Sequence, residues 1–168
     1  MKAENIIGPV SIVEKPERSY LGIRFKTPFG GMFAVITKKL KELRKWSKEN
    51  SLSEEAPYFV RYYHCDMKSI MDVEVGLMTN SGHVGQGRIK PNSLPKGKYA
   101  TLIYRGNGLR GNQALMQWAS ENGVTFDPID VRKKETYICR YEAYLTDYRI
   151  ESRKLLWDVE LSIKIAED

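Results

Sequence analysis

The chain has 168 residues, of which 42% are hydrophobic and 29% charged, with a formal net charge of +6. This length and composition are typical of one globular domain with a sizeable core, and they exclude a disordered or low-complexity protein. The longest unbroken apolar run, residues 32–36, is too short to cross a bilayer, and the N-terminus does not resemble a signal peptide. The sequence therefore predicts a cytoplasmic protein that does not act at a membrane.

The reactive side chains give little support to metal or cofactor chemistry. Cys65 and Cys139 form no CxxC pair, and two histidines, His64 and His83, are too few for a site with several histidine ligands. His64, Cys65 and Asp66 are adjacent, and successive strand residues point to opposite faces. We therefore expect neither a metal nor a cofactor.

Positive charge is concentrated in two stretches. Residues 38–48 contain six lysines and arginines, and residues 75–120 contain several basic side chains but no acidic one. A basic surface attracts phosphate backbones without specificity. A solvated helix face and basic loops explain the pattern better, because the chain contains no recognition motif for nucleic acid. We expect no sequence-specific nucleic-acid binding.

Hydrophobic spacing in the first half predicts two extended pieces followed by a helix and two strands. The extended pieces are residues 11–14 and 20–25, and the strands are residues 58–65 and 72–77. The helix between them ends near Asn50, and its apolar positions recur at helical spacing. The predicted inward residues of this helix are Phe33, Ile36, Leu40, Leu43 and Trp46.

The second half has a similar order after a Gly, Ser and Asn loop at 79–87. A strand at 99–104 precedes a glycine-rich break at 106–111, a helix at 112–122 and strands at 137–145 and 155–165. The tryptophans at 118 and 157 are predicted to lie in the core. The break matches the spacing GxGxxG of dinucleotide-binding turns, but no series of strand–helix–strand units surrounds it. We interpret it as a turn.

The order strand, helix, strand, strand thus occurs twice. Residues 61–63 align with 140–142, and 72–75 align with 158–161. Such a repeat indicates a pseudo-twofold arrangement in which neither half buries its apolar face alone. The predicted fold class is α+β in one domain, with repeats at 1–84 and 85–168, helices on one side of the sheets and a ligand groove on the other.

The stretch 140–145 is the candidate for the groove. At a period of two, Tyr141 and Ala143 share an apolar face, and Glu142 and Tyr144 share the other. A carboxylate beside a phenol suggests that this second face lines the groove. The alternative is a surface ion pair between Glu142 and Arg61 or Arg140.

Three segments carry a family resemblance: Pro57-Tyr58-Phe59-Val60-Arg61-Tyr62, Asp72-Val73-Glu74-Val75-Gly76 and residues 141–147. In order and spacing they resemble the GyrI-like small-molecule-binding domains, which form the effector-binding part of multidrug-responsive bacterial regulators of the MerR and AraC types. The resemblance covers the whole chain. It implies two repeats around a central groove that accepts aromatic or cationic molecules, with an acidic residue at Glu142 and groove tyrosines at Tyr63 and Tyr144.

Three functions follow from the resemblance. The first is binding of a hydrophobic or aromatic small molecule, with Glu142 as counter-ion, and the second is toxin resistance by hydrolysis of the cyclopropane of DNA-alkylating natural products. In that reaction Glu142 would deprotonate a water, and Tyr63 or Tyr144 would stabilise the developing phenolate. The third is a gyrase-inhibitor-like module with gyrase or a regulator as protein partner.

Further candidates for the groove are strand residues that share its predicted face. Phe59 and Arg61 lie in the strand of Tyr63, while Glu74 and Glu160 occupy equivalent positions of the two repeats. Phe59 would form the floor and the two carboxylates would add acidic groups. Glu74 and Glu160 fit a solvent-facing position at the rim equally well.

Overall fold

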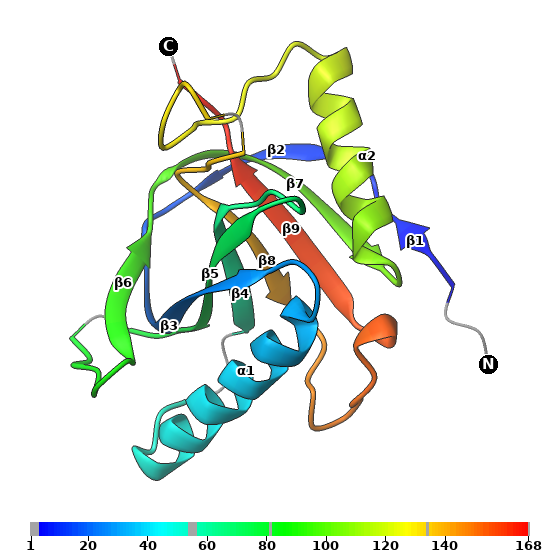
Figure 1. Cartoon of the computed structure of the whole chain (residues 1–168). Helices are drawn as coiled ribbons and strands as arrows, with labels where there is room; N and C mark the ends of the chain where they lie inside the picture. The colour runs from blue at the N-terminus through cyan, green and yellow to red at the C-terminus, as the bar shows by residue number, and fades with distance from the viewer. Residues whose placement is uncertain (1–3, 54–56, 81, 134, 168) are drawn as a thin grey trace.

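The computed structural model describes residues 4–53, 57–80, 82–133 and 135–167. It consists of a large antiparallel sheet with two helices on one side (Figure 1). The predicted α+β class is confirmed, as is the placement of both helices on one side of the sheet. No helix within the described ranges is both long and apolar enough to span a membrane.

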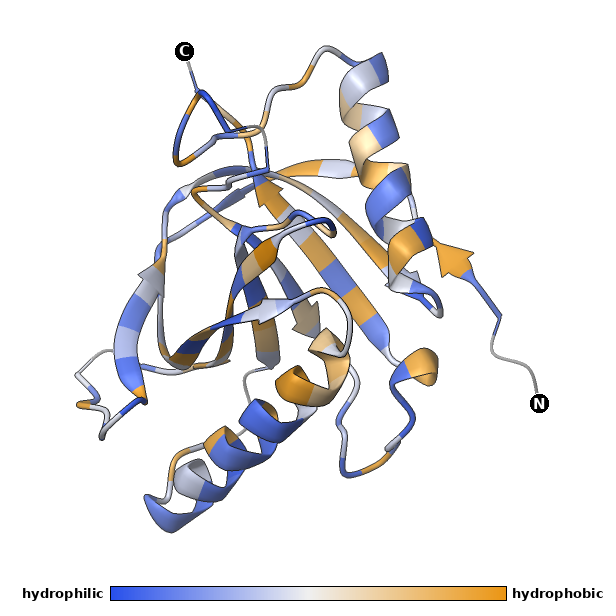
Figure 2. Cartoon of the chain, in the orientation of Figure 1, coloured by the Kyte–Doolittle hydropathy of each residue, from blue (hydrophilic) through white to orange (hydrophobic). Residues whose placement is uncertain are grey.

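The first half supplies β3 (Arg18–Pro28), α1 (Met32–Glu49), β4 (Tyr58–His64) and β5 (Ile70–Met78). Gly31 precedes α1 with a φ of 79°, a left-handed conformation that glycine adopts without steric cost. Met32, Ile36, Leu40 and Leu43 are buried on one side of the helix, as the spacing predicted for the last three. The rest of the helix surface is largely charged (Figure 2).

The second half supplies β7 (Gly97–Arg105), α2 (Gly108–Glu121), β8 (Arg140–Tyr144) and β9 (Asp158–Lys164). A short 3₁₀ turn, η1 (Lys154–Leu156), precedes β9 where the sequence predicted strand. The helix α2 begins earlier than predicted, inside the glycine-rich break. The side chain of Asn107 makes this early start possible, because it accepts a hydrogen bond from the Leu109 N–H and so caps the helix.

The strands follow the order β1-β7-β9-β8-β4-β5-β3-β6, with β2 also paired to β7. The edges exchange partners between the halves. β1 (Ile6–Ile7) and β2 (Ser11–Lys15) come before β3 in the chain but pair with β7 of the second half. β6 (Lys90–Leu94) comes just before β7 but pairs with β3 of the first half. β6 was not predicted, since its sequence Lys-Pro-Asn-Ser-Leu lacks the usual strand formers. The repeat boundary near residue 84 stays a prediction.

The two halves meet at the antiparallel pair β4 and β8, in the middle of the sheet. Their register places Val60 opposite Glu142 and Phe59 opposite Ala143. Residues directly opposite each other in a pair of strands point to the same face. Glu142 therefore shares its face with Val60 and Tyr62, and not with Tyr63 as the sequence predicted.

Both faces of the sheet are largely buried. The helix side holds one apolar cluster that includes Val60, Leu161 and Leu115 of α2. The opposite side holds a second cluster of Tyr20, Phe59, Met78, Leu94, Tyr99, Cys139, Tyr141 and Ala143. Figure 1 shows β4, β8 and β9 between the two helices.

Candidate functional site

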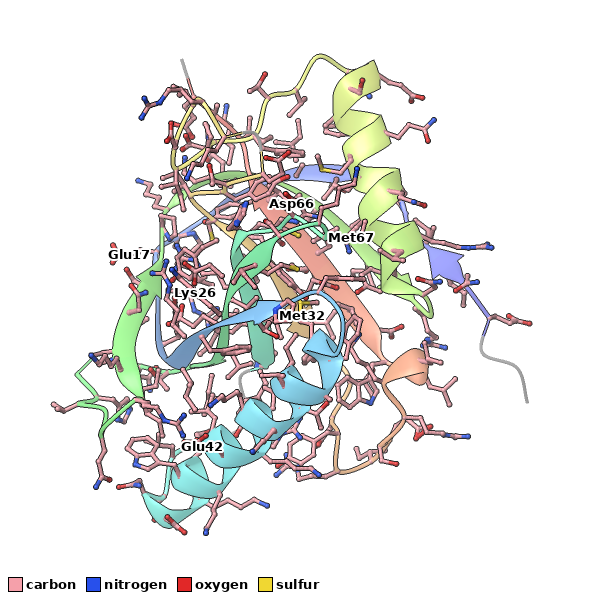
Figure 3. The ribbon with its side chains drawn as sticks, in the orientation of Figure 1. Glu17, Lys26, Met32, Glu42, Asp66 and Met67 are labelled. Atoms are coloured by element: carbon pink, nitrogen blue, oxygen red, sulfur yellow. The ribbon has the colours of Figure 1, made fainter. Side chains whose placement is uncertain are left out.

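A large cavity lies on the helix side of the sheet and has a volume of about 740 Å³. This size suits a small organic molecule. The beginnings of α1 and α2, the strands β4, β5, β7 and β8, the segment after β4, and η1 all contribute lining residues. Figure 3 shows Met32 at the start of α1, with Asp66 and Met67 in the region between the two helices. The groove was predicted on the opposite side of the sheet, and the cavity corrects that prediction.

Glu142 projects from β8 into this cavity and is only 7% exposed. The hydroxyl of Tyr104 on β7 donates a hydrogen bond to Glu142 Oε2. Among the described residues, no other side chain donates a hydrogen bond to this carboxylate. The second oxygen, Oε1, thus has room for a donor or a positive charge supplied from the cavity.

Two glycines of α2 allow the helix to lie directly on Tyr104. A Cβ atom at Gly111 would be 2.6 Å from Tyr104 Cδ1, and one at Gly108 would be 3.0 Å from the hydroxyl oxygen. Gly106, before the helix, has a φ of 100°, which favours glycine. The GxGxxG spacing at 106–111 therefore serves a turn followed by close helix packing, and through Tyr104 it supports the position of Glu142.

The environment of Glu142 keeps the surrounding phenols and thiol protonated. Burial and the neighbouring Glu142 carboxylate raise the pKa of Tyr104 and of Tyr62 well above the ordinary value for tyrosine. Burial likewise raises the pKa of the Cys65 thiol. Around Glu142 the cavity therefore presents neutral hydroxyl groups and aromatic faces.

The rim of the cavity combines apolar and charged side chains. Phe33 lies there with 51% exposure, so it does not belong to the buried core as predicted. The Lys154 ammonium lies 5.2 Å from the Phe33 ring centroid and 5.6 Å from that of Tyr144. Both are within cation–π distance. Met67, Leu109 and Leu155 add exposed apolar surface at the entrance.

Four predicted site residues lie on the opposite face, in a cluster without a large cavity. Glu74 Oε1 accepts hydrogen bonds from Tyr63 at 2.7 Å and from Tyr20 at 2.5 Å. Arg61 donates to Tyr20 and to the carbonyl oxygens of Ser93 and Ile138. Phe59 is fully buried and packs edge-on against Tyr20 and Tyr141.

The two remaining predicted residues are also outside the large cavity. Glu160 forms an ion pair with Lys15 of β2 at 2.6 Å on the opposite face, where a smaller cavity of about 280 Å³ lies. Tyr144 is on the side of Glu142 but packs against Trp157 in a tilted arrangement, with ring centroids 5.2 Å apart. It lines a separate cavity of about 360 Å³.

Of the predicted set, only Glu142 lines the large cavity. Sequence reasoning missed Tyr62 and Tyr104 as its neighbours because both were assigned to core strands. The pairing of β4 with β8 is the signal that could have identified Tyr62. Val60 lies opposite Glu142, so Tyr62, two residues further along β4, points to the same face as Glu142. A shift of one residue in register reverses every such assignment. No group of three or more His, Cys, Asp or Glu side chains within the described ranges could hold a metal.

Solved structures share this fold at low sequence identity. The C-terminal domain of EcmrR superposes with a TM-score of 0.68 and 22% identity, over 96% of this chain and 99% of that domain. The chain spans only 58% of EcmrR in its DNA complex, where the TM-score is 0.70, the identity 23% and the coverage of this chain 95%.

Two further structures extend the comparison. SAV2435 bound to tetraphenylphosphonium has a TM-score of 0.64 at 9% identity, with 94% of each chain covered. A hydrolase from Listeria innocua has a TM-score of 0.61 at 14% identity, over 94% of this chain and 91% of its own. No curated protein matches the chain by sequence.

An antiparallel sheet with two helices on one side defines the class of α+β domain that this chain shares with these solved structures. The sequence profile of the GyrI-like small molecule binding domain matches residues 8–165. The chain therefore belongs to the GyrI-like small-molecule-binding domain family.

Proposed function

We propose that the chain binds a hydrophobic aromatic cation in the cavity that Glu142 lines. The observation that carries this proposal is the position of Glu142: a buried carboxylate with one tyrosine donor and no cationic partner at ion-pair distance within the described ranges. A buried charge that lacks a partner is costly. A cationic ligand would compensate the charge at the moment of binding.

The other lining residues suit the body of such a ligand. Tyr62, Tyr104 and Phe33 contribute aromatic rings, and Met32, Met71 and Met116 contribute flexible thioether side chains. Aromatic faces attract cations, and methionines adapt to ligands of different shape. The structure of SAV2435 with tetraphenylphosphonium supports the same ligand class for this fold.

Tetraphenylphosphonium titrated into the purified chain by calorimetry tests the proposal. We expect Glu142→Gln to weaken binding about tenfold or more, because a charge-assisted contact is lost while the shape of the side chain is kept. Glu160→Gln removes a carboxylate from the opposite face and serves as the matched control. Equal loss of affinity in both variants, or unchanged binding in Glu142→Gln, would contradict the proposed site.

The same geometry supports a second candidate, hydrolysis of a cyclopropane-containing alkylating agent. Glu142 Oε1 has no hydrogen-bond donor among the described residues and could orient a water toward a bound ligand. Glu142 would take a proton from that water while the water oxygen bonds to the cyclopropane carbon of the ligand. The carbon–carbon bond of the ring would break, and its electrons would move to the oxygen of the ligand that becomes a phenolate. Mass spectrometry for a water adduct, formed by the wild type and not by Glu142→Gln, separates turnover from simple binding.

A further inference from the structure

Arg140 is a buried cation that forms no ion pair within the described part of the chain. It lies two residues before Glu142 on the same face of β8, is 6% exposed, and lines the same cavity. None of the described carboxylates forms an ion pair with it, and its Nε atom is buried without a hydrogen-bond partner. Burial of an unpaired charge is unfavourable, so this arrangement favours a ligand that supplies the missing negative charge.

Two contacts hold the guanidinium group in place. Arg140 Nη2 donates to Asn112 Oδ1 of α2 at 2.6 Å, and the guanidinium carbon lies 4.7 Å from the Tyr137 ring centroid. A planar guanidinium fixed in this manner recognises a carboxylate through two parallel hydrogen bonds. Because both contacts are neutral, neither of them compensates the positive charge of Arg140.

The first turn of α2 contributes to the same part of the cavity. Gly106, Asn107, Gly108 and Leu109 line the cavity, and the first turn contains no acidic side chain. None of the described residues accepts a hydrogen bond from the backbone N–H of Gly108 or Arg110. The N-terminus of a helix carries a partial positive charge that favours a bound anion. Arg140 and the first turn of α2 therefore both favour a bound anion.

We propose that Arg140 and the first turn of α2 form an anion subsite of the cavity, so that the ligand is a zwitterion. Its cationic group faces Glu142, its carboxylate or similar anion faces Arg140, and its aromatic body lies between the two helices. Alternate residues along a strand are about 7 Å apart, which sets the approximate separation of the two ligand charges. This inference rests on the proposed function, since it adds an anion subsite to the proposed cation site.

Rhodamine B and its ethyl ester provide matched probes. Both carry the same delocalised positive charge on an aromatic ring system, but only rhodamine B has a free carboxylate. We expect the wild type to bind rhodamine B about tenfold more tightly than the ester, measured by fluorescence anisotropy. Arg140→Gln should remove this preference while the affinity for the ester changes by less than about twofold.

Two further variants keep the test decisive. Arg18→Gln removes an exposed charge from β3, outside the large cavity and the first turn of α2, and should retain the full preference for rhodamine B. Arg140→Lys keeps the positive charge without the planar fork and should retain part of the preference. It replaces Arg140→Gln if thermal unfolding shows that the latter does not fold.

The outcomes separate the two proposals. Equal affinity of the wild type for rhodamine B and its ester, beside normal binding of tetraphenylphosphonium, would overturn the anion subsite alone. A preference that Arg140→Gln keeps would also overturn it. Failure of both dyes and of tetraphenylphosphonium to bind would overturn the proposed cation site together with the subsite.

Discussion

Glu74 and Glu142 lie on opposite faces of one sheet, and each accepts hydrogen bonds from tyrosine hydroxyls. Glu74 has two tyrosine donors, Tyr20 and Tyr63, whereas Glu142 has Tyr104 alone among the described side chains. The carboxylate of Glu74 also lies against the backbone of β3, since a Cβ atom at Gly22 would be 2.9 Å from its Oε2. Glu142 instead borders a cavity of about 740 Å³.

The difference shows how the surroundings decide what a buried carboxylate does. Glu74 is enclosed and hydrogen-bonded within the fold, so its interactions contribute to stability and leave no space for a ligand. Glu142 is equally buried but has an oxygen that a ligand can reach. An acidic residue in a strand therefore does not by itself identify a binding site. The site is identified by how many hydrogen-bond donors the protein supplies to the carboxylate and by the volume of the cavity next to it.

The largest expected effect on stability comes from Glu74→Gln. The substitution weakens two charge-assisted hydrogen bonds and places an amide NH2 group against the β3 backbone at Gly22, so we expect the free energy of unfolding to fall by about 3 kcal/mol. Glu142→Gln should change it by less than about 1 kcal/mol, because the amide can still accept the Tyr104 hydrogen bond. Urea unfolding of both variants measures the difference. Equal destabilisation would show that the two carboxylates have the same structural role.

Gly111→Ala should have an intermediate effect on the Glu142 side. The added Cβ atom would meet the Tyr104 ring at 2.6 Å, so α2 or the ring must move. We expect a loss of about 2 kcal/mol in the free energy of unfolding, typical of overpacking, together with weaker binding of tetraphenylphosphonium.

Gly30→Ala is the matched control, because nothing lies within 4 Å of a Cβ atom at that position. It should change stability by no more than about 0.5 kcal/mol. If Gly111→Ala also leaves stability and binding unchanged, the contact between α2 and Tyr104 does not position Glu142.

A further expected effect concerns alkaline pH and the Glu74 side. Burial and the Glu74 carboxylate raise the pKa of Tyr63 to about 12, above its ordinary value near 10. A raised pKa in the folded state gives stability that is fully present below about pH 10 and is lost as the pH rises through about 12. Urea unfolding from about pH 8 to pH 12 should show this decline, with a smaller slope in Tyr63→Phe. An identical slope in the two proteins would contradict the assignment to Tyr63.

Much of the fold could be predicted from the sequence. The periodicity of Ile36, Leu40 and Leu43 indicated α1, and the alternation of Val73, Val75 and Leu77 indicated β5. These signals are local, since they depend only on which side of one element is apolar. The exchange of β2 and β6 between the halves left no such local signal, because pairing between distant strands is decided by the whole sheet.

The candidate site could be predicted only in part. The sequence placed an acidic residue at Glu142, but it combined Glu142 with Tyr63, which points to the opposite face. Both faces of β4 and β8 are buried, so the alternation of apolar and polar residues could not show which face meets the helices. The tertiary structure decided this through the register of β4 with β8, and it brought Tyr62 and Tyr104 to Glu142 from parts of the chain that no local pattern connects. The amino-acid sequence by itself determined most of the elements and the acidic residue. The cavity depends on the tertiary structure, because its lining comes from the beginnings of both helices, from four strands and from the segment after β4.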